Sequence, residues 1–221
     1  MKVLLNSKFS FTNMLIETII AIFLFICVAI FSLINLHNIL TVHKRKSNVK
    51  VYAEVEHPSG FMVSIAALGT MAYFLEVLAY MFLVFTGLSS LLYTATYCFQ
   101  LPFMFHIQIL GSILTFAGYF LFNWSVIARG KYAVSWNMPE NQKLVTWGPY
   151  HYVRHPSYLG YFLMFFGLLF IWPSLFTLLP LTAILGYYRI TVEEERLLTQ
   201  RFGDEYLEYQ KMTGRFIPKF G

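Results

Sequence analysis

Residues 144–161 read LVTWGPYHYVRHPSYLGY and gather glycine, proline, histidine, arginine and four tyrosines within an otherwise strongly apolar chain. The His155-Pro156 step decides the local structure. The proline ring pushes His155 out of the helical region, and Pro156 suits the first position of a helix. We therefore predict a helix that begins at Pro156, with His155 as its N-cap. Its first backbone N–H groups, which we expect to be free to bind an anion, belong to Ser157, Tyr158 and Leu159. Taken alone, Pro156 favours a helix start that binds nothing, and its neighbours must supply the argument for a site.

The composition places the chain in a membrane. Of its 221 residues, 57% are hydrophobic and only 12% are charged, whereas about a quarter of the residues in an average domain are charged. The net charge of +5 comes from short segments between apolar runs, as the positive-inside rule expects, and nucleic-acid binding is not favoured. Cys27 and Cys98 form no CxxC pattern, so we expect neither a disulfide framework nor a zinc site.

Apolar runs predict an all-α polytopic membrane protein with about five transmembrane helices. Three spans are expected at residues 14–40, 60–85 and 102–127. A further apolar run, 158–188, is interrupted at Trp172-Pro173-Ser174, which predicts a C-terminal helical hairpin. Each arm of about fifteen residues rises only about 22 Å, less than the roughly 30 Å of a hydrocarbon core, so the hairpin is tilted or does not cross fully.

Lysine and arginine counts predict the orientation. Segments 41–57, 128–157 and the tail from Arg189 are basic, which places them and the C-terminus on the cytoplasmic side. Segments 144–157 and 189–210 then leave the membrane on the same face and should be neighbours.

Two polar residues, Glu76 and His106, lie inside the expected spans. Glu76 is a candidate because it lies within a span, but no motif surrounds it, and helix packing is the favoured interpretation. His106 has no second histidine at ligand spacing. We therefore predict no metal site.

The segment after the hairpin is acidic on one side. Arg189 and Glu193 are four residues apart and share a helical face, which by itself predicts a surface ion pair of about 0.3–0.5 kcal/mol. The functional interpretation is a polar cluster opposite His155. Three consecutive glutamates, Glu193 to Glu195, repel one another, which favours a cationic partner.

Two motifs resemble a known family. GPYHYVRHPSYLGYF, followed by RITVEEERLLTQRFGDEYLEYQK and FIP, is similar to the C-terminal signature of isoprenylcysteine carboxyl methyltransferases and, less specifically, of membrane phospholipid methyltransferases. The resemblance covers about residues 105–220. It divides the chain into N-terminal transmembrane helices without a recognised motif, residues 1–100, and a methyltransferase core, residues 101–221.

The resemblance implies an S-adenosylmethionine-dependent enzyme that methylates the carboxylate of a prenylated cysteine or a similar isoprenoid or lipid acceptor. It implies that Arg189 pairs with the acceptor carboxylate and that Glu193 or Glu194 faces the cofactor's positive end. His155 and the helix start would receive the methionine carboxylate. The implied cofactor pocket faces the cytosol and includes a strand-like segment at residues 142–145. It consists of Gln142, Lys143, Leu144, Val145, Tyr150, His155, Pro156, Ser157, Tyr158 and Glu194.

Methyl transfer to a carboxylate needs no general base, because the nucleophile is already ionised at neutral pH. This agrees with the absence of an evident Ser/His/Asp or Cys/His arrangement. A phospholipid N-methyltransferase, in contrast, would need a base to remove a proton. Two classes outside methyl transfer also stay open: an NADPH-dependent membrane reductase with a similar His-Pro-Tyr region, and a non-enzymatic membrane scaffold. No GxGxxG follows a strand, which excludes a Rossmann-type enzyme.

Overall fold

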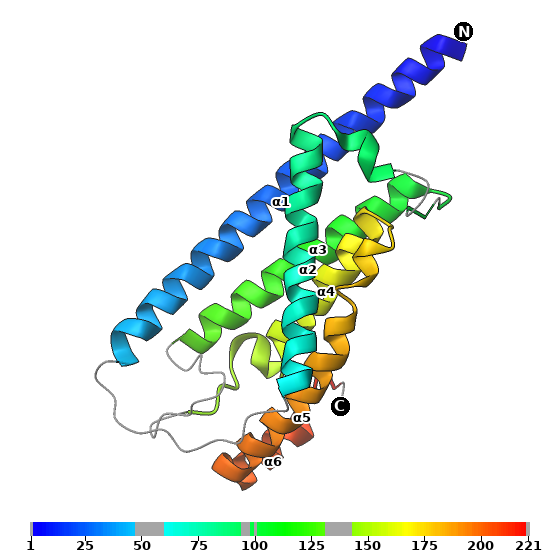
Figure 1. Ribbon diagram of the computed structural model, residues 1–221. Coiled ribbons are helices and arrows are strands. Elements are labelled where there is room, and N and C mark those ends of the chain that lie inside the picture. The colour runs from blue at the N-terminus through cyan, green and yellow to red at the C-terminus, as the bar shows by residue number, and fades with distance from the viewer. Residues whose placement is uncertain (1, 47–59, 94–97, 100, 131–142, 220–221) are drawn as a thin grey trace.

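The computed structural model describes residues 2–46, 60–93, 98–99, 101–130 and 143–219. These residues form a bundle of helices (Figure 1). The α-helices are α1 (Lys2–Lys46), α2 (Gly60–Phe85), α3 (Met104–Arg129), α4 (Pro156–Ile171), α5 (Thr182–Phe202) and α6 (Asp204–Met212). Short 3₁₀ turns are η1 (Ser89–Tyr93), η3 (Gly148–His151) and η4 (Phe176–Leu178).

Three of these helices are long and apolar enough to cross a membrane. Their candidate spans are Ile16–Thr41, Gly60–Phe85 and Met104–Arg129, which agrees with the three predicted spans to within about two residues. The helix α4 is apolar but shorter, at 16 residues. The chain is thus a helical membrane protein, and a total of five crossings stays a prediction.

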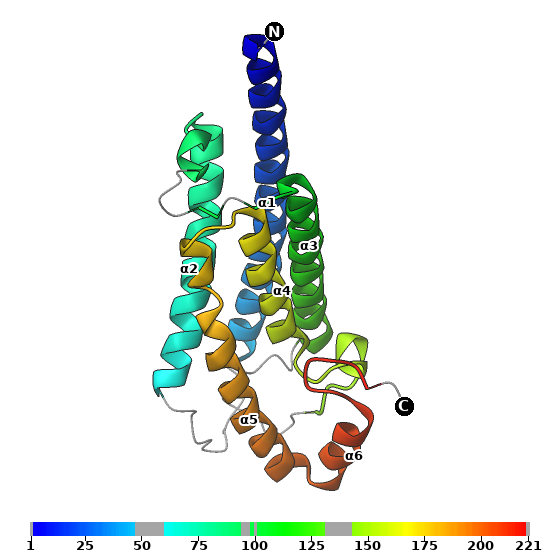
Figure 2. The same ribbon diagram turned by 90° about the vertical axis from the view of Figure 1, so that its right-hand side faces the viewer.

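The predicted hairpin is present only as a reversal of the chain. The helix α4 ends at the predicted break, where Trp172 is its C-cap. The next helix begins only at Thr182, after η4, and continues to Phe202. The two arms do not pack mainly on each other, because α4 lies along α3 and α5 lies along α2 (Figure 2).

Glycines explain why α4 packs on α3 and α5 packs on α2. A Cβ atom on Gly118 of α3 would lie 2.6 Å from the backbone oxygen of Gly160 of α4. A second pair, Gly111 and Gly167, meets in the same way one heptad further along. Small residues at a membrane interface let two backbones approach closely and gain packing contacts that lipid does not supply.

The α2–α5 contact uses the same principle. A Cβ atom on Gly69 would lie 2.7 Å from the Cβ atom of Ala183, and one on Gly186 would lie 2.7 Å from the backbone nitrogen of Ala66. Aromatic rings fill the remaining space between α4 and α5. The ring centroid of Tyr187 lies 4.7 Å from that of Tyr158.

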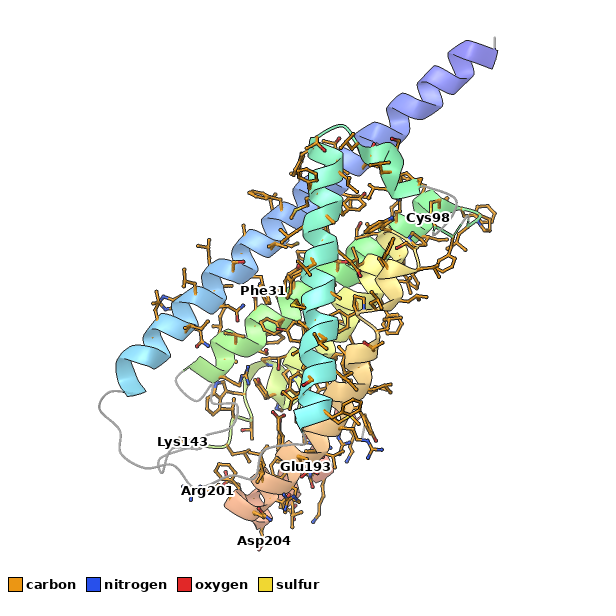
Figure 3. The ribbon with its side chains drawn as sticks, viewed as in Figure 1. Phe31, Cys98, Lys143, Glu193, Arg201 and Asp204 are labelled. Carbon is orange, nitrogen blue, oxygen red and sulfur yellow. The ribbon has the colours of Figure 1, made fainter. Side chains whose placement is uncertain are left out.

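The C-terminal tail returns to the start of α4. The backbone N–H of Arg154 donates to the carbonyl of Gly214 at 2.9 Å, and that of His155 donates to Arg215 at 3.1 Å. The ring of Phe216 packs on Phe162 with centroids 5.0 Å apart. The segment before α4, the end of α5 and the tail therefore meet at one end of the bundle, where Figure 3 labels Lys143 and Glu193. This confirms that the two polar segments are neighbours.

Candidate functional site

The helix α4 begins at Pro156 as predicted, and His155 is its N-cap with φ −125° and ψ 61°. Its side chain makes no capping hydrogen bond. One of the three expected free donors is engaged, because the N–H of Leu159 donates to the carbonyl of His155 at 3.1 Å. The prediction is wrong for Leu159, which is the first residue late enough to close an intrahelical bond on the N-cap carbonyl.

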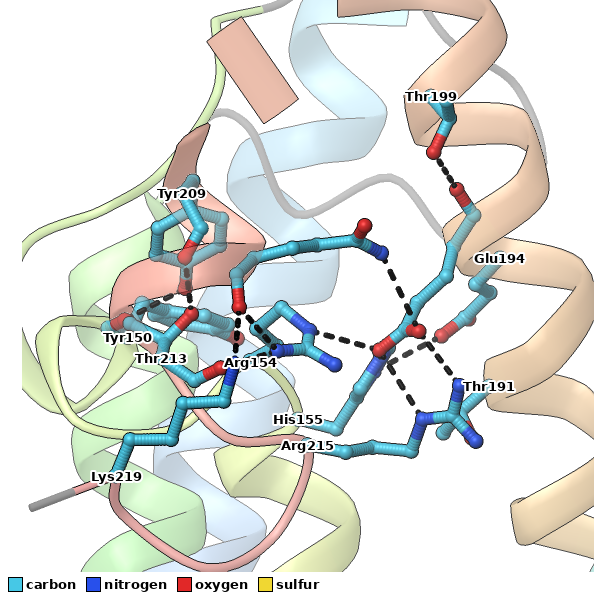
Figure 4. Close-up of polar contacts among 12 residues, drawn as sticks. Tyr150, Arg154, His155, Thr191, Glu194, Thr199, Tyr209, Thr213, Arg215 and Lys219 are labelled. Carbon is cyan, nitrogen blue, oxygen red and sulfur yellow. Dashed lines mark hydrogen bonds and ion pairs between the residues drawn. The ribbon is translucent and has the colours of Figure 1, made fainter. Parts of the chain in front are cut away.

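His155 is buried between two carboxylates of α5 (Figure 4). Its Nδ1 lies 3.4 Å from Oε2 of Glu194, and its Nε2 lies 3.2 Å from Oε1 of Glu195. The imidazole ring is nearly parallel to that of Tyr158, with centroids 5.8 Å apart. Both ring nitrogens thus face acceptors, which is the arrangement that favours a doubly protonated, cationic histidine.

Glu195 is the centre of the largest ionic cluster among the described residues. Its Oε1 lies 2.8 Å from Nε of Arg154, and its Oε2 lies 2.6 Å from Nη2 of Arg215. The Nε2 amide of Gln210 lies 3.5 Å from Oε2. Arg154 also donates to the carbonyl of Thr213, so the cluster fixes the tail as well.

Sequence reasoning missed this cluster and named the two glutamates before it. Glu195 carries no distinguishing local signal, since it is the third of three identical residues. Arg154 lies inside the motif around His155, but nothing in the motif marks it as an ionic partner. Arg215 lies in a tail whose pairing with the α4 start is not encoded in any local pattern.

The titration of this cluster follows from its contacts. Burial alone would lower the pKa of His155, but hydrogen bonds and the charges of Glu194 and Glu195 raise that pKa above its ordinary 6.5. Burial alone would raise the pKa of Glu195, but hydrogen bonds from His155, Arg215 and Arg154 bring it well below 4.5. The folded protein therefore favours a cationic His155 and an ionised Glu195.

This titration predicts a pH window of greatest stability. The raised pKa of His155 contributes stability below about pH 6.5 that is lost as the pH rises through the folded value. The lowered pKa of Glu195 contributes stability above about pH 4.5 that is lost as the pH falls through the folded value. The thermal midpoint in detergent should therefore peak between these values. In His155→Asn the decline on the alkaline side should be absent, and an unchanged decline would contradict the assignment to His155.

The structure separates the two candidate glutamates. Glu194 accepts a hydrogen bond from the hydroxyl of Tyr158 at 2.8 Å and keeps 19% of its side chain exposed. Glu193 instead pairs with Arg196 at 3.2 Å, with both side chains more than 40% exposed. Such an exposed pair contributes little to stability. Of the two, only Glu194 joins His155.

Arg189 is exposed on α5. At 100° per residue it lies about 140° around the helix from Glu194, and it shares a face with Glu193. The expected surface pair between Arg189 and Glu193 is replaced by the Glu193–Arg196 pair. The structure therefore does not bring Arg189 into the cluster around His155.

The segment before α4 is only partly as predicted. Gln142 lies outside the described residues. Lys143 is exposed, Leu144 is half-buried and Val145 is buried, but these residues have no strand conformation. Residues 143–145 form no strand, because they pair with no neighbouring extended backbone within the described chain.

Tyr150 lies in η3 and is buried. Its carbonyl accepts a hydrogen bond from the hydroxyl of Tyr209 at 2.6 Å. The turn before it depends on Gly148, whose φ of 63° favours glycine. Among the residues that the structure describes, no group of three histidine, cysteine, aspartate or glutamate side chains is placed to hold a metal ion.

Comparisons with known proteins find similarity to methyltransferases. Residues 106–205 match the family model described as phospholipid methyltransferase. A protein-S-isoprenylcysteine O-methyltransferase of Schizosaccharomyces pombe is 40% identical over 78 residues, which cover 34% of this chain and 33% of that protein. The Homo sapiens protein of the same name is 37% identical over 81 residues, covering 36% of this chain and 28% of its own length.

The chain thus spans about a third or less of the length of the curated relatives that it matches. The matched segment contains the start of α4, His155, Glu194 and Glu195. The predicted resemblance is confirmed: this segment carries the phospholipid methyltransferase pattern and is similar to the isoprenylcysteine carboxyl methyltransferases.

Proposed function

We propose that this protein transfers a methyl group from S-adenosylmethionine to the carboxylate of a prenylated cysteine or a similar lipid-borne acid. The observation that carries the proposal is the placement of Glu194. Its carboxylate is partly exposed and lies at the start of α4, held by Tyr158 and His155. This arrangement lies within the segment that matches methyltransferases.

The residues present fit a cofactor that carries a positive and a negative group. Glu194 offers a carboxylate to a sulfonium or ammonium group, and Tyr158 and His155 keep that carboxylate in place. The backbone N–H groups at the start of α4 favour an anion. Because both nitrogens of His155 face glutamates, we assign His155 to hold Glu194, and no longer to receive the methionine carboxylate. Val145 and Tyr150 remain proposed walls of the pocket.

The bound cofactor would supply an electrophilic methyl group. The tasks of the chain are then to align the acceptor, to exclude water and to place the two reactants close together. No residue has to remove a proton from a carboxylate, which suits a His155 that is held cationic between two glutamates. We propose that Arg189, exposed on α5, meets the acceptor carboxylate, because its planar guanidinium pairs with such groups.

The acceptor's apolar tail would remain among the apolar helices while its polar end reaches the pocket. Lysine and arginine in the segments at this end of the bundle support a pocket and a C-terminus on the cytoplasmic side. Membrane lipids and a prenylated protein or small molecule are the proposed partners.

Binding and transfer test the proposal together. Calorimetry with S-adenosylhomocysteine should show binding to the wild type in detergent. This binding should weaken by about tenfold or more in Glu194→Gln, as expected for losing a contact to a charged group, and stay unchanged in Glu193→Gln. Arg189→Ala should raise the KM for a farnesylated N-acetylcysteine without changing affinity for S-adenosylhomocysteine.

The product identifies the chemistry. A labelled methyl group on a carboxylate forms an ester and is released as methanol by alkali, whereas a methyl group on a phospholipid amine is not. The alkali-stable product would favour the phospholipid N-methyltransferase. Binding of NADPH without binding of S-adenosylhomocysteine would reject methyl transfer in favour of the reductase.

A further inference from the structure

Of the seven buried side-chain atoms without a hydrogen-bond partner in the described part of the chain, two belong to residues within electrostatic reach of Glu194. They are Nε of Arg129 and the hydroxyl oxygen of Tyr150. The side chains of Ser125 and Ser157 lie close to the hydroxyl of Tyr150. Buried polar groups are normally paired, so two such atoms in one region indicate a place for a ligand.

Packing fixes Arg129 beside the turn that precedes α4. It is the last residue of α3, and the end of this helix lies against the turn before η3. The indole nitrogen of Trp147 donates to the carbonyl of Ala128 at 3.0 Å, and a Cβ atom on Gly148 would lie 3.0 Å from that of Ala128. Arg129 is within electrostatic reach of Tyr150, Tyr158 and Glu194.

The other cations of the cluster already have partners. Arg154 and Arg215 pair with Glu195, and His155 lies between Glu194 and Glu195. No ion pair is formed by Arg129 among the described residues, although Glu194 is in its vicinity. Arg129 is half-buried, but its Nε is shielded from water, and a buried donor without a partner is costly, so an anion is expected to complete this position.

We propose that Arg129, assisted by the hydroxyl of Tyr150, binds the α-carboxylate of the cofactor's amino-acid portion. A cation and an anion presented close together, Arg129 and Glu194, match the carboxylate and the ammonium that an α-amino acid carries on one carbon atom. The guanidinium is suited to a carboxylate because it offers several N–H donors in one plane. This inference rests on the proposed function, and it gives a role to a residue that the sequence marks only as the end of a span.

Removing the carboxylate from the ligand tests the inference directly. Calorimetry compares S-adenosylhomocysteine with its decarboxylated analogue, which keeps the amine. The wild type should bind S-adenosylhomocysteine about 10- to 100-fold more tightly, the range expected for hydrogen bonds to a charged group. In Arg129→Gln the two ligands should bind equally, and the affinity for the decarboxylated analogue should stay within about twofold of the wild type, because that ligand never contacted Arg129.

Several variants separate binding from folding. Arg196→Gln removes an exposed cation by the same substitution and should keep the full preference. Tyr150→Phe should reduce the preference in part. If Arg129→Gln does not fold, Arg129→Lys keeps the charge but not the planar fork, and should show a reduced preference for the carboxylate.

The outcomes are distinct. A preference for S-adenosylhomocysteine that survives in the Arg129 variants would overturn the inference and leave methyl transfer intact. Equal loss of affinity for both ligands would show a structural role for Arg129 and overturn it as well. A wild type that binds neither ligand would reject the proposed function, and the inference with it. If Arg129→Gln keeps the preference for S-adenosylhomocysteine but raises the KM for the acceptor, the inference is overturned and Arg129 is assigned to the acceptor carboxylate instead.

Discussion

Glu195→Ala is expected to lower the free energy of unfolding by about 3–5 kcal/mol, because it leaves buried positive groups without their shared anion. Arg154, Arg215 and His155 all contact this carboxylate, and the side chains of Glu195 and Arg154 are only 8% and 10% exposed. A loss of this size corresponds to a fall in Tm of about 10 °C for a chain of this length. Thermal unfolding in detergent measures it.

Two further variants control this expectation. Glu193→Ala removes the same group two positions earlier, where the side chain is 42% exposed, and should change stability by no more than about 0.5 kcal/mol. Glu195→Gln keeps the size and some hydrogen bonds and should fall between the two. A Tm for Glu195→Ala equal to that of Glu193→Ala would refute the central role of Glu195.

Loss of this carboxylate should also release the tail. Arg154 and Arg215 join the tail to the start of α4 through backbone and side-chain bonds. With their common anion removed, proteolysis after Lys211 or Arg215 should become faster, because cleavage requires local opening. Binding of S-adenosylhomocysteine should weaken too, since His155 loses one of its two acceptors.

Adding a single methyl group at Gly118 or Gly160 is expected to cause the second large loss of stability. A Cβ atom on Gly118 would lie 2.6 Å from the carbonyl oxygen of Gly160, and one on Gly160 would lie 2.8 Å from that of Gly118. Both neighbours are backbone atoms, so no side chain is available to move aside and the helices must separate. Gly118→Ala and Gly160→Ala should each cost about 1–3 kcal/mol or more, measured by thermal unfolding.

Gly60→Ala is the matched control. Gly60 begins α2 and has no atom within 4 Å of a Cβ position. The same substitution there should be neutral or slightly stabilising, by about 0.4–1 kcal/mol, because it restricts the unfolded chain. Equal Tm values for the Gly118, Gly160 and Gly60 variants would contradict close packing of α3 on α4. Arg129 ends α3, and His155 is the N-cap of α4. Separation of these helices would move the two residues apart and should therefore also weaken cofactor binding.

The sequence by itself determined features that depend on local physics. Continuous apolar runs placed the three spans, the proline ring placed the start of α4 at Pro156, and Trp172-Pro173 placed its end. The motif around His155 and the glutamates after Arg189 indicated the family. Each of these follows from the residues themselves or from their immediate neighbours.

Only the tertiary structure decided which of the three consecutive glutamates contact His155. Consecutive residues of a helix point about 100° apart, so the answer depends on the rotation of α5. That rotation is set by Ala183 and Gly186, which must face α2 because their small size permits the close approach. Glu194 and Glu195 are thereby turned toward His155, and Glu193 is turned outward.

The tail contacts and the placement of Arg129 have the same origin. Gly214 and Arg215 meet the start of α4 across about sixty residues of chain, and Arg129 comes within electrostatic reach of Tyr158 and Glu194 because α3 and α4 pack through glycines. Long-range contacts of this kind arise when packed helices bring distant residues together, and no local pattern of hydrophobicity or backbone preference encodes them.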